Sequence, residues 1–396
     1  MALDEILLLT NGPGELSTWV PPVLRRLRVA EPSARLELFL VRDQFSAGTE
    51  AARARELDLD AVYGRAELLG RIASRKPRGR GRVLMLGGAP RDAALLGRAL
   101  GYPAFVYSFD HKAWYPGLSG LMVDSERTRK AAVARGADAA KTHTVGNLVR
   151  DAMEDARGGG DQAADVLIFP SSRPFAARYL LGFMLAAAER MAAARPGLRF
   201  GWVRSRLLTD AAVGEALSGR FAGEIGGVSA RLEGAGQGDE GRGHLLTQNG
   251  LRVEVVSESA RYSAMAGAKV AVTIPGTNTL ELALAGLPAV VLLPLHKPEL
   301  LPLEGVLHWL FMLPGGRGLK QRFVLGLERR VGHLALPNQW LGERVFPELR
   351  GVFGPDAVAE AALELLEPAR RQQIRTRLQD LDAPPGADNL VRKVLE

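Results

Sequence analysis

Short apolar runs recur along the chain, and each is closed by glycine, proline or a polar turn before a segment with helical spacing begins. Runs of this kind indicate strands that are buried on both faces, as in a parallel sheet. The first series of predicted strands lies at 5–10, 36–41, 83–86, 104–107, 120–123 and 141–145. After three glycines at 158–160, which indicate a linker, a second series lies at 166–169, 200–203, 253–256, 270–274 and 289–295.

This alternation predicts an α/β protein with two doubly wound, parallel-sheet, Rossmann-like domains that face each other across a cleft. We place an N-terminal domain at 1–157 and a C-terminal domain at 161–350. Residues 354–396 are predicted to form helices that pack back on the N-terminal domain or on a partner subunit.

The stretch from Lys269 to Leu295 holds the clearest candidate for a ligand site. It predicts a strand, a turn at Pro275 and Gly276, a helix with Glu281 in its first turn, and a second strand. Such a turn leaves unpaired N–H groups and the positive end of a helix dipole at the carboxyl edge of the sheet, where a phosphate binds. A capped helix without a ligand is the alternative, because the loop has only one glycine.

The net charge of +7 and the pI of about 9.8 have several interpretations. A basic balance suits nucleic acid, an anionic membrane surface or an anionic small substrate, and it can also reflect a GC-rich genome. Because aromatic and basic residues do not interleave as they do in single-strand binders, no nucleic-acid partner is expected.

Composition limits the remaining classes of function. The absence of cysteine excludes disulfides and thiolate chemistry and fits a cytoplasmic protein. The six histidines are scattered without ligand spacing, so no metal ion and no other cofactor is expected. No apolar run reaches the roughly 18 to 20 residues of a spanning helix, and the first residues lead into a strand without the features of a signal peptide.

Four segments carry a resemblance to a known family. They are FPSSR at 169–173, TVGNLVRD at 144–151, PGTNTLE at 275–281 and LPNQWLGERVFPEL at 336–349. Their order and spacing resemble those of lipid A disaccharide synthase, and the last two are the most specific. The resemblance covers nearly the whole chain and implies the two-domain glycosyltransferase fold called GT-B.

The resemblance implies transfer of a sugar from a UDP-sugar to a sugar-bearing lipid at the cytoplasmic face of the membrane, inverting and without a metal. By the same resemblance the N-terminal domain binds the acceptor and the C-terminal domain binds the nucleotide-sugar. The positions implied for the donor are Gly276, Thr277 and Asn278 at the diphosphate, Glu281 at the hydroxyls, Ser171, Ser172 and Arg173 near the phosphates, and Asn338 at the nucleotide-sugar. Helix-terminal amides and an arginine are suited to stabilising a departing diphosphate.

Sugar transfer of this kind needs a base to deprotonate the acceptor hydroxyl. Glu15 is the first candidate, since it follows the first strand; Gly12 and Gly14 beside it are candidate substrate-binding positions. Asp92 is the second, although Arg91 stands where the family carries an acid. Both carboxylates have an alternative role as helix caps.

Three further segments are candidates for a role in catalysis or lipid binding. The neighbouring pair Asp110 and His111 is a third option for the base, but such pairs more often lie on the surface. Residues 300–322 combine the apolar helix Val306–Leu313 with basic residues behind it, which suits an anionic membrane surface, the protein core or a homodimer contact. Residues 19–22 are a candidate apolar lip for an acyl chain.

The sequence therefore predicts a cytoplasmic GT-B glycosyltransferase bound peripherally to the inner face of the membrane. Its donor would be a UDP-N-acetylhexosamine or an acylated derivative, and its acceptor a lipid. Two alternatives remain: a UDP-sugar 2-epimerase of the same fold, and a non-catalytic nucleotide- or lipid-binding relative that has lost its acid.

Overall fold

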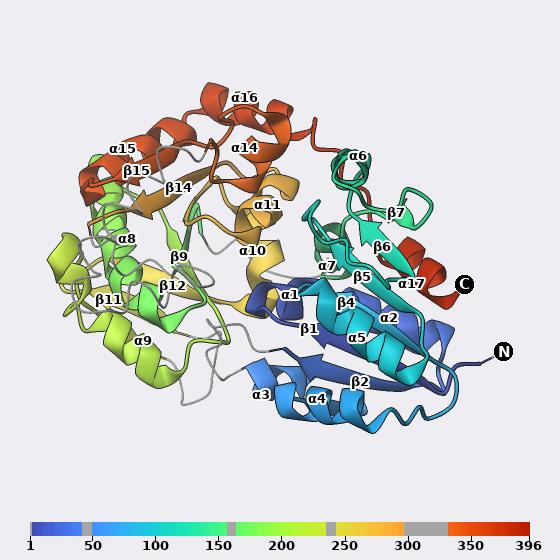
Figure 1. Cartoon of the computed structure of the whole chain (residues 1–396). Coiled ribbons are helices and arrows are strands. Elements are labelled where there is room, and N and C mark those ends of the chain that lie inside the picture. Colours follow the sequence, from blue (N-terminus) through green and yellow to red (C-terminus); the bar gives the residue numbers. More distant parts are fainter. Residues whose placement is uncertain (1, 42–49, 157–163, 235–242, 297–331) are drawn as a thin grey trace, which may run out of the picture. The chain divides into compact units, whose positions relative to one another are not determined.

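The chain folds into two compact units, Met1–Arg157 with Asp382–Glu396 (unit 1) and Gly158–Leu381 (unit 2), as drawn in the computed structural model of Figure 1. The structure describes residues 2–41, 50–156, 164–234, 243–296 and 332–396. Each unit contains one twisted sheet with helices packed against it.

Unit 1 is built on a seven-stranded sheet in which every pairing is parallel. In sequence order its strands are β1 (Glu5–Thr10), β2 (Arg35–Leu40), β3 (Ala61–Tyr63), β4 (Gly81–Leu86), β5 (Ala104–Ser108), β6 (Gly120–Val123) and β7 (Thr142–Thr144). Their spatial order is β3-β2-β1-β4-β5-β6-β7, so the order reverses between β1 and β4. At such a switch point the loops after two neighbouring strands diverge and leave room for a ligand.

Helices cover both faces of this sheet. They are α1 (Pro13–Thr18), α2 (Val20–Ala30), α3 (Glu50–Ala54), α4 (Arg65–Ser74), α5 (Pro90–Leu100), α6 (Glu126–Ala134), α7 (Leu148–Asp155) and α17 (Ala387–Leu395). One core joins Leu7 and Phe39 of the strands to Leu68 of α4 and Leu96 of α5. On the other face α2 packs against α7 and α17. The continuous apolar strands are explained by this burial from both sides.

Unit 2 has an eight-stranded sheet with a parallel centre and an antiparallel edge. Its strands are β8 (Val166–Phe169), β9 (Phe200–Arg204), β10 (Ala230–Glu233), β11 (His244–Thr247), β12 (Arg252–Ser257), β13 (Val270–Thr273), β14 (Ala289–Pro294) and β15 (Glu348–Gly351). The spatial order is β10-β11-β12-β9-β8-β13-β14-β15, and among the described strands only the pairings of β11 with β10 and with β12 are antiparallel. The order reverses between β8 and β13, which makes a second switch point.

The helical elements of unit 2 follow the same scheme. They are α8 (Pro174–Ala194), α9 (Asp210–Leu217), the 3-10 turns η1 (Ala222–Ile225) and η2 (Glu258–Ala260), α10 (Arg261–Gly267), α11 (Thr277–Leu284), α14 (Leu336–Leu341), α15 (Pro355–Leu366) and α16 (Pro368–Leu378). The long helix α8 packs against α9 and α15, while α11 packs against β13, β14 and α14.

The two ends of the predicted helical tail belong to different units. Helices α15 and α16 lie in unit 2, whereas α17 lies in unit 1 and packs on α2. The segment before α17 is fixed by Asp151, whose Oδ2 accepts the backbone N–H groups of Gly386 at 2.6 Å and Ala387 at 3.0 Å. Residues 354–381 thus complete unit 2, and only the last helix returns to unit 1.

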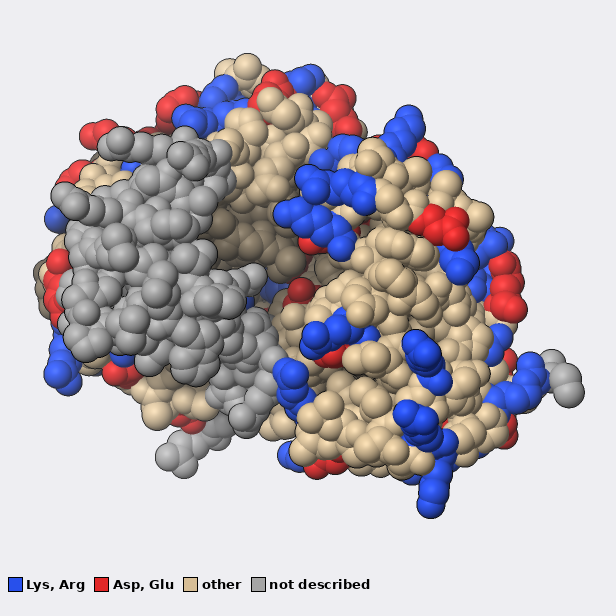
Figure 2. Space-filling model, viewed as in Figure 1, with Lys and Arg blue, Asp and Glu red and all other residues tan. Residues whose placement is uncertain are grey.

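The surface carries its charge in separate groups. On the described part of the face in Figure 2, lysine and arginine side chains alternate with aspartate and glutamate and with uncharged surface. The positive net charge is therefore not gathered into one continuous basic surface on that face.

Candidate functional site

Glu15 lies at the carboxyl edge of β1, where unit 1 switches strand order. It belongs to the first turn of α1, and two glycines make room for its side chain. A Cβ atom on Gly12 would fall 2.0 Å from Glu15 Oε2, and one on Gly87 would fall 2.6 Å from Glu15 Cγ. Gly87 also has a φ of +79°, which favours glycine. The loops after β1 and β4 are therefore shaped around the carboxylate predicted to be the base.

Asp92 lies at the same edge of the sheet, after the end of β4. It lies in the first turn of α5, and its carboxylate is 3.8 Å from Arg91 Nε. The strands β1 and β4 are neighbours, and Thr10 Oγ1 donates to the carbonyl of Leu86 at 2.8 Å where both strands end. The structure thus brings the loops of both candidate bases, together with Gly12 and Gly14, to one edge of unit 1.

An aromatic cluster lies behind this edge. The ring centroid of Trp19 is 5.2 Å from that of Tyr107 and 4.8 Å from that of Phe109, with edge-to-face geometry in both pairs. Trp19, Val20 and Pro22 are buried in unit 1. These residues form core rather than the apolar lip suggested by the sequence.

An apolar-walled cavity of about 570 Å³ opens beside Gly12. Its lining comes from the ends of β1 and β2 and from α1, α3 and α4, and comprises Asn11, Gly12, Leu16, Leu40, Val41, Glu50, Ala51, Gly64, Arg65, Ala66, Glu67 and Leu69. Its volume lies in the range of ligand pockets, which are mostly apolar with a few polar groups. The sequence did not predict this cavity, because its walls come from separate elements.

The carboxyl edge of β8 and β13 carries the other predicted residues. These two strands pair in parallel, so the turn with Ser171, Ser172 and Arg173 lies beside the turn that begins α11. Ser171 Oγ accepts the N–H of Arg173 at 2.9 Å, and Arg173 is the N-cap residue of α8. Both turns lie at the switch point of unit 2.

The turn before α11 presents backbone donors. Among the described residues, the N–H groups of Thr277 and Asn278 have no hydrogen-bond acceptor. Gly276 is exposed and has a φ of +152°, a conformation that other residues rarely adopt. The side-chain amide of Asn278 donates to Thr273 Oγ1 and holds the turn. Free amides at a helix N-terminus form an anion site.

Glu281 is held by an arginine that the sequence did not single out. Arg261 Nε donates to Glu281 Oε2 at 2.9 Å, and Arg261 Nη2 donates to Tyr262 Oη at 2.7 Å. Glu258 lies on the other side of the guanidinium, with Oε1 3.6 Å from Nη1. Burial alone would lower the pKa of Arg261, but the attraction of Glu281, Tyr262 and Glu258 outweighs burial and raises that pKa. Burial and the charge of Glu281 raise the pKa of Tyr262.

Asn338 does not face a ligand site. Its side chain is fully buried, donates to the carbonyl of Phe346 and to Glu348 Oε1, and accepts the N–H of Phe346, each at 2.8 Å. These bonds close the segment between α14 and β15. The implied contact with a nucleotide-sugar is therefore replaced by a structural role, because the amide has no exposed surface.

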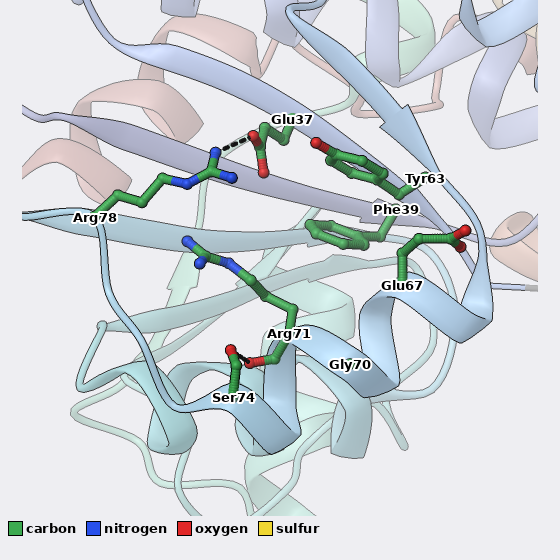
Figure 3. A pocket seen from close by; sticks show the side chains of 8 residues that line it. All are labelled: Glu37, Phe39, Tyr63, Glu67, Gly70, Arg71, Ser74 and Arg78. Atoms are coloured by element: carbon green, nitrogen blue, oxygen red, sulfur yellow. Dashed lines mark hydrogen bonds and ion pairs between the residues drawn. The ribbon is translucent and has the colours of Figure 1, made fainter.

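A second hollow, of about 290 Å³, is lined by residues of β2, β3 and α4 and by Arg78 (Figure 3). Arg71 Nη2 donates to the buried Glu5, and Arg78 Nη1 donates to the buried Glu37, at 2.5 Å in each case. Tyr102 Oη also donates to Glu5 at 2.6 Å, and burial together with this bond raises the pKa of Tyr102. Arg71 and Arg78 are thus each paired with a buried glutamate, although Arg71 Nε has no hydrogen-bond partner among the described residues, and we assign the hollow no ligand.

The remaining predicted features are outside the two edges or outside the described residues. Asp110 and His111 lie 3.8 Å apart, and both are substantially exposed, as expected of a surface pair. The segment 300–322, including Val306–Leu313, lies outside the described residues. Within the described ranges no helix has the length and hydropathy of a membrane span, and no group of three or more histidine and acidic side chains converges as a metal site requires.

The residues that sequence reasoning missed share one property. Asn11, Glu258 and Arg261 follow buried parallel strands closely, at the carboxyl edge where ligands bind. The polar residues just after each predicted strand were the signal that could have identified these positions. The residues that each of them contacts depend on the order of the strands in the sheet, which the sequence does not give.

The fold matches solved structures, whereas no protein-family model and no curated protein matches the sequence. A putative UDP-N-acetylglucosamine 2-epimerase from Listeria monocytogenes aligns with a TM-score of 0.57 at 11% identity, over 100% of this chain and 95% of that one. S. aureus MnaA in complex with UDP gives 0.56 at 11% identity, over 99% and 95%. The UDP-GlcNAc 2-epimerase of Neisseria meningitidis, bound to UDP-GlcNAc, gives 0.54 at 11% identity, over 99% and 98%. Similarity at this level identifies the fold: two parallel-sheet α/β domains of the GT-B type, as in enzymes that act on UDP-sugars.

Proposed function

We propose that the protein is a UDP-sugar-dependent glycosyltransferase that moves a sugar to a lipid-linked acceptor. The donor would be a UDP-N-acetylhexosamine or an acylated derivative, as the resemblance to lipid A disaccharide synthase implies. The observation that carries the proposal is the pairing, at one edge of unit 1, of the Glu15 carboxylate with an apolar-walled cavity that shares the Gly12 wall.

Unit 2 supplies the features that suit the donor. The turn of Gly276 offers a diphosphate the positive end of α11 and two amides that have no acceptor within the described part of the chain, and Arg173 lies in the neighbouring turn. Two of the solved structures with this fold contain UDP or UDP-GlcNAc, which supports a nucleotide-sugar as the ligand here.

Unit 1 supplies the features that suit an acceptor. A sugar-bearing lipid has a hydroxyl to be deprotonated and an acyl chain to be shielded from water. Glu15, with Asp92 as the second candidate, would take the proton, and the cavity bounded by Leu16, Leu40 and Leu69 would cover part of the acyl chain.

The proposed transfer balances without an added co-reactant. The carboxylate accepts the proton of the acceptor hydroxyl, and the resulting oxygen forms a bond to the anomeric carbon from the face opposite the leaving group. The bond between that carbon and the diphosphate oxygen breaks, and UDP leaves with the electron pair. The amides at α11 and the guanidinium of Arg173 would stabilise the charge that develops on the leaving group.

The test is transfer in solution. Purified full-length protein is incubated with radiolabelled UDP-N-acetylglucosamine and a bacterial total lipid extract, and lipid-bound label and released UDP are measured. Label in the lipid fraction together with stoichiometric UDP supports the proposal. UDP binding without transfer to any lipid fraction contradicts it and favours a non-catalytic binding protein.

A UDP-sugar 2-epimerase is the second candidate, because the solved structures cited above are titled as such enzymes. This activity needs no acceptor. Incubation with UDP-N-acetylglucosamine alone in heavy water, followed by NMR, separates the two candidates: inversion and deuterium at C2 would establish the epimerase.

The proposed cellular setting follows from the lipid acceptor. We place the protein in the cytoplasm, peripheral on the inner face of the membrane, with residues 300–322 as the contact. Flotation of the purified chain with anionic vesicles, compared with a chain that carries charged substitutions at Leu307 and Phe311, tests this placement.

A further inference from the structure

The helices α4 and α5 of unit 1 pack against each other, and the segment that contains them is strongly basic. Their inner faces serve the fold, because Leu68 of α4 and Leu96 of α5 belong to the core. Residues 65–100 hold nine lysine and arginine side chains and two acidic ones, a net charge of +7. The whole chain also has a net charge of +7, so the remaining sequence is neutral on balance. The cationic character of the protein therefore comes from this one part of unit 1.

Several of these cations have no partner within the protein. Arg71 and Arg78 pair with the buried Glu5 and Glu37. By contrast, no carboxylate in the described part of the chain pairs with four exposed side chains of the segment, which are Arg65, Arg75, Lys76 and Arg98. Like charges that are not compensated repel one another and destabilise a compact state. An external anionic partner would relieve this repulsion.

Leucine side chains lie among the cations on the outer side of the two helices. Leu69 of α4 is 55% exposed, and Leu95 of α5 is 43% exposed. Leu69 follows Arg65 by four residues, and Leu95 precedes Arg98 by three, so each leucine shares a helix surface with an arginine. Figure 2 shows separate blue groups on largely uncharged surface over these helices. Cations combined with exposed leucines are typical of helices that lie on an anionic bilayer, whereas nucleic-acid binding depends on phosphate contacts.

This outer side also borders the cavity of about 570 Å³ that we propose covers part of an acyl chain. The cavity wall includes four residues of α4, which are Arg65, Ala66, Glu67 and Leu69. Leu69 is therefore both a wall of the cavity and part of the exposed surface. A lipid that leaves a bilayer here reaches the cavity without exposing its whole acyl chain to water, which is unfavourable for apolar groups.

We propose that the outer side of α4 and α5 is a membrane-binding surface whose partner is an anionic phospholipid bilayer. The four unpaired cations lie at the headgroups, and Leu69 and Leu95 enter the boundary with the acyl chains. The surface belongs wholly to unit 1 and is separate in sequence from residues 300–322. Its binding to a bilayer needs no nucleotide, whereas its use as the entry for the acceptor rests on the proposed function.

The test is sedimentation of the full-length protein with vesicles of equal parts phosphatidylglycerol and phosphatidylcholine, without nucleotide. Each cation near an anionic surface is worth about fivefold in affinity, so Arg65→Gln, Arg75→Gln and Arg98→Gln together should weaken binding about 100-fold. Leu95→Ser should weaken it about 3- to 10-fold, because less apolar surface enters the bilayer. Because all these side chains are exposed, the variants should keep the urea unfolding midpoint of the wild type.

The matched control removes three charges from another part of unit 1, in the triple variant Lys130→Gln, Arg135→Gln and Lys141→Gln. These exposed residues lie on α6 and before β7, which is the strand at the opposite edge of the sheet from β3. Charges far from the bilayer are screened, so the control should bind within about threefold of the wild type. Equal losses in the two triple variants would mean that net charge alone drives binding and would overturn the inference.

Three other outcomes would also contradict this surface. Undiminished binding by the Arg65, Arg75 and Arg98 variant would exclude it, and tighter binding to a DNA duplex, lost in the same variant, would assign it to nucleic acid. If that variant does not fold, Arg98→Gln alone should lose about fivefold, and no loss would exclude the surface. A wild-type protein that does not bind the vesicles would refute this inference, whereas the proposed function stands or falls separately by the transfer assay.

Discussion

Asn338 donates a hydrogen bond to Glu348 at 2.8 Å, and the backbone N–H groups of Leu334 and Ala335 converge on the same Oε1 atom at 2.8 and 2.9 Å. Arg350 contacts the other oxygen, Oε2. Burial alone would raise the pKa of Glu348. The hydrogen bonds from these donors lower it by more, so the net pKa lies below its ordinary value of 4.5.

In Glu348→Gln the free energy of unfolding should therefore depend less on pH in the acidic range. A carboxyl with a lowered pKa stabilises the fold above its unfolded pKa, and this stabilisation is lost as the pH falls through the folded value. At pH 7 the variant should be less stable by about 1–3 kcal/mol, since Arg350 loses its partner. Urea unfolding at pH 7 and at pH 3.5 should show the difference shrinking at the lower pH. An equal difference at both pH values would contradict the assignment.

For Asp124 we expect a pH dependence of stability with the opposite sign. Its side chain is 1% exposed, and neither carboxylate oxygen has a hydrogen-bond partner among the described residues. Burial raises its pKa above the ordinary 3.8, so the native state loses stability as the pH rises through the folded value. Asp124→Asn should stabilise unit 1 by about 1–3 kcal/mol at pH 7 and by almost nothing near pH 3. A destabilised variant at pH 7 would show that the charge is compensated in solution.

Arg71→Met should destabilise unit 1 strongly. It leaves the fully buried carboxylate of Glu5 without its cation, a change that typically costs about 3–5 kcal/mol. Lys393→Met removes a more exposed ion pair with Glu396 and should cost less than about 1 kcal/mol. Chemical denaturation of both variants gives the comparison; similar losses would mean that burial of Glu5 is not what matters.

Gly276→Ala should weaken UDP binding more than it weakens the fold. A side chain at a φ of +152° is strained and would meet Asn278 Oδ1 at 3.2 Å, so the turn must shift. Gly286→Ala is the control, because that glycine also has a positive φ, of +66°, with no atom within 4 Å of an added Cβ. Each should cost about 1–2 kcal/mol of stability, but only Gly276→Ala should reduce the affinity measured by calorimetry. Equal affinities of the two variants for UDP would show that the Gly276 turn is not part of the binding site.

Glu15→Gln should abolish turnover while UDP affinity is retained, since the proposed base lies in unit 1 and the nucleotide site in unit 2. A loss of about 10²–10⁴-fold is typical for a general base. Asp92→Asn distinguishes the two candidates when assayed beside it. Gly12→Ala provides a geometric check, because the added methyl displaces only the end of the Glu15 side chain; it should lower turnover with little change in stability. Near-normal turnover in Glu15→Gln would exclude Glu15.

The sequence pattern predicted the central strands well, because strands buried on both faces are apolar throughout. The predicted bounds of 120–123 and 166–169 coincide with β6 and β8. The edge strands β10 and β11 are not among the strands predicted from the sequence, because their sequences, ARLE and HLLT, mix polar with apolar residues. Such strands are held by their neighbours more than by their own hydrophobicity.

In the candidate site, too, the features set by local sequence could be predicted and those that depend on strand order could not. The turn at Gly276 is local, so its sequence predicted both its shape and its position after β13. The ion pair of Arg261 with Glu281 joins two helices, and the position of Glu15 against Gly87 joins two strands, so each depended on strand order. The role implied for Asn338 differed because its partners, Phe346 and Glu348, satisfy the amide internally.

The return of α17 to unit 1 has a consequence for synthesis on the ribosome. Residues up to 157 emerge first, yet the apolar face of α17, with Leu390, Val391 and Val394, packs on α2 only after residues 382–396 have been translated. Unit 2, by contrast, is one continuous stretch. We therefore expect the nascent chain to complete its second unit before its first, with α2 exposed to chaperones during the delay.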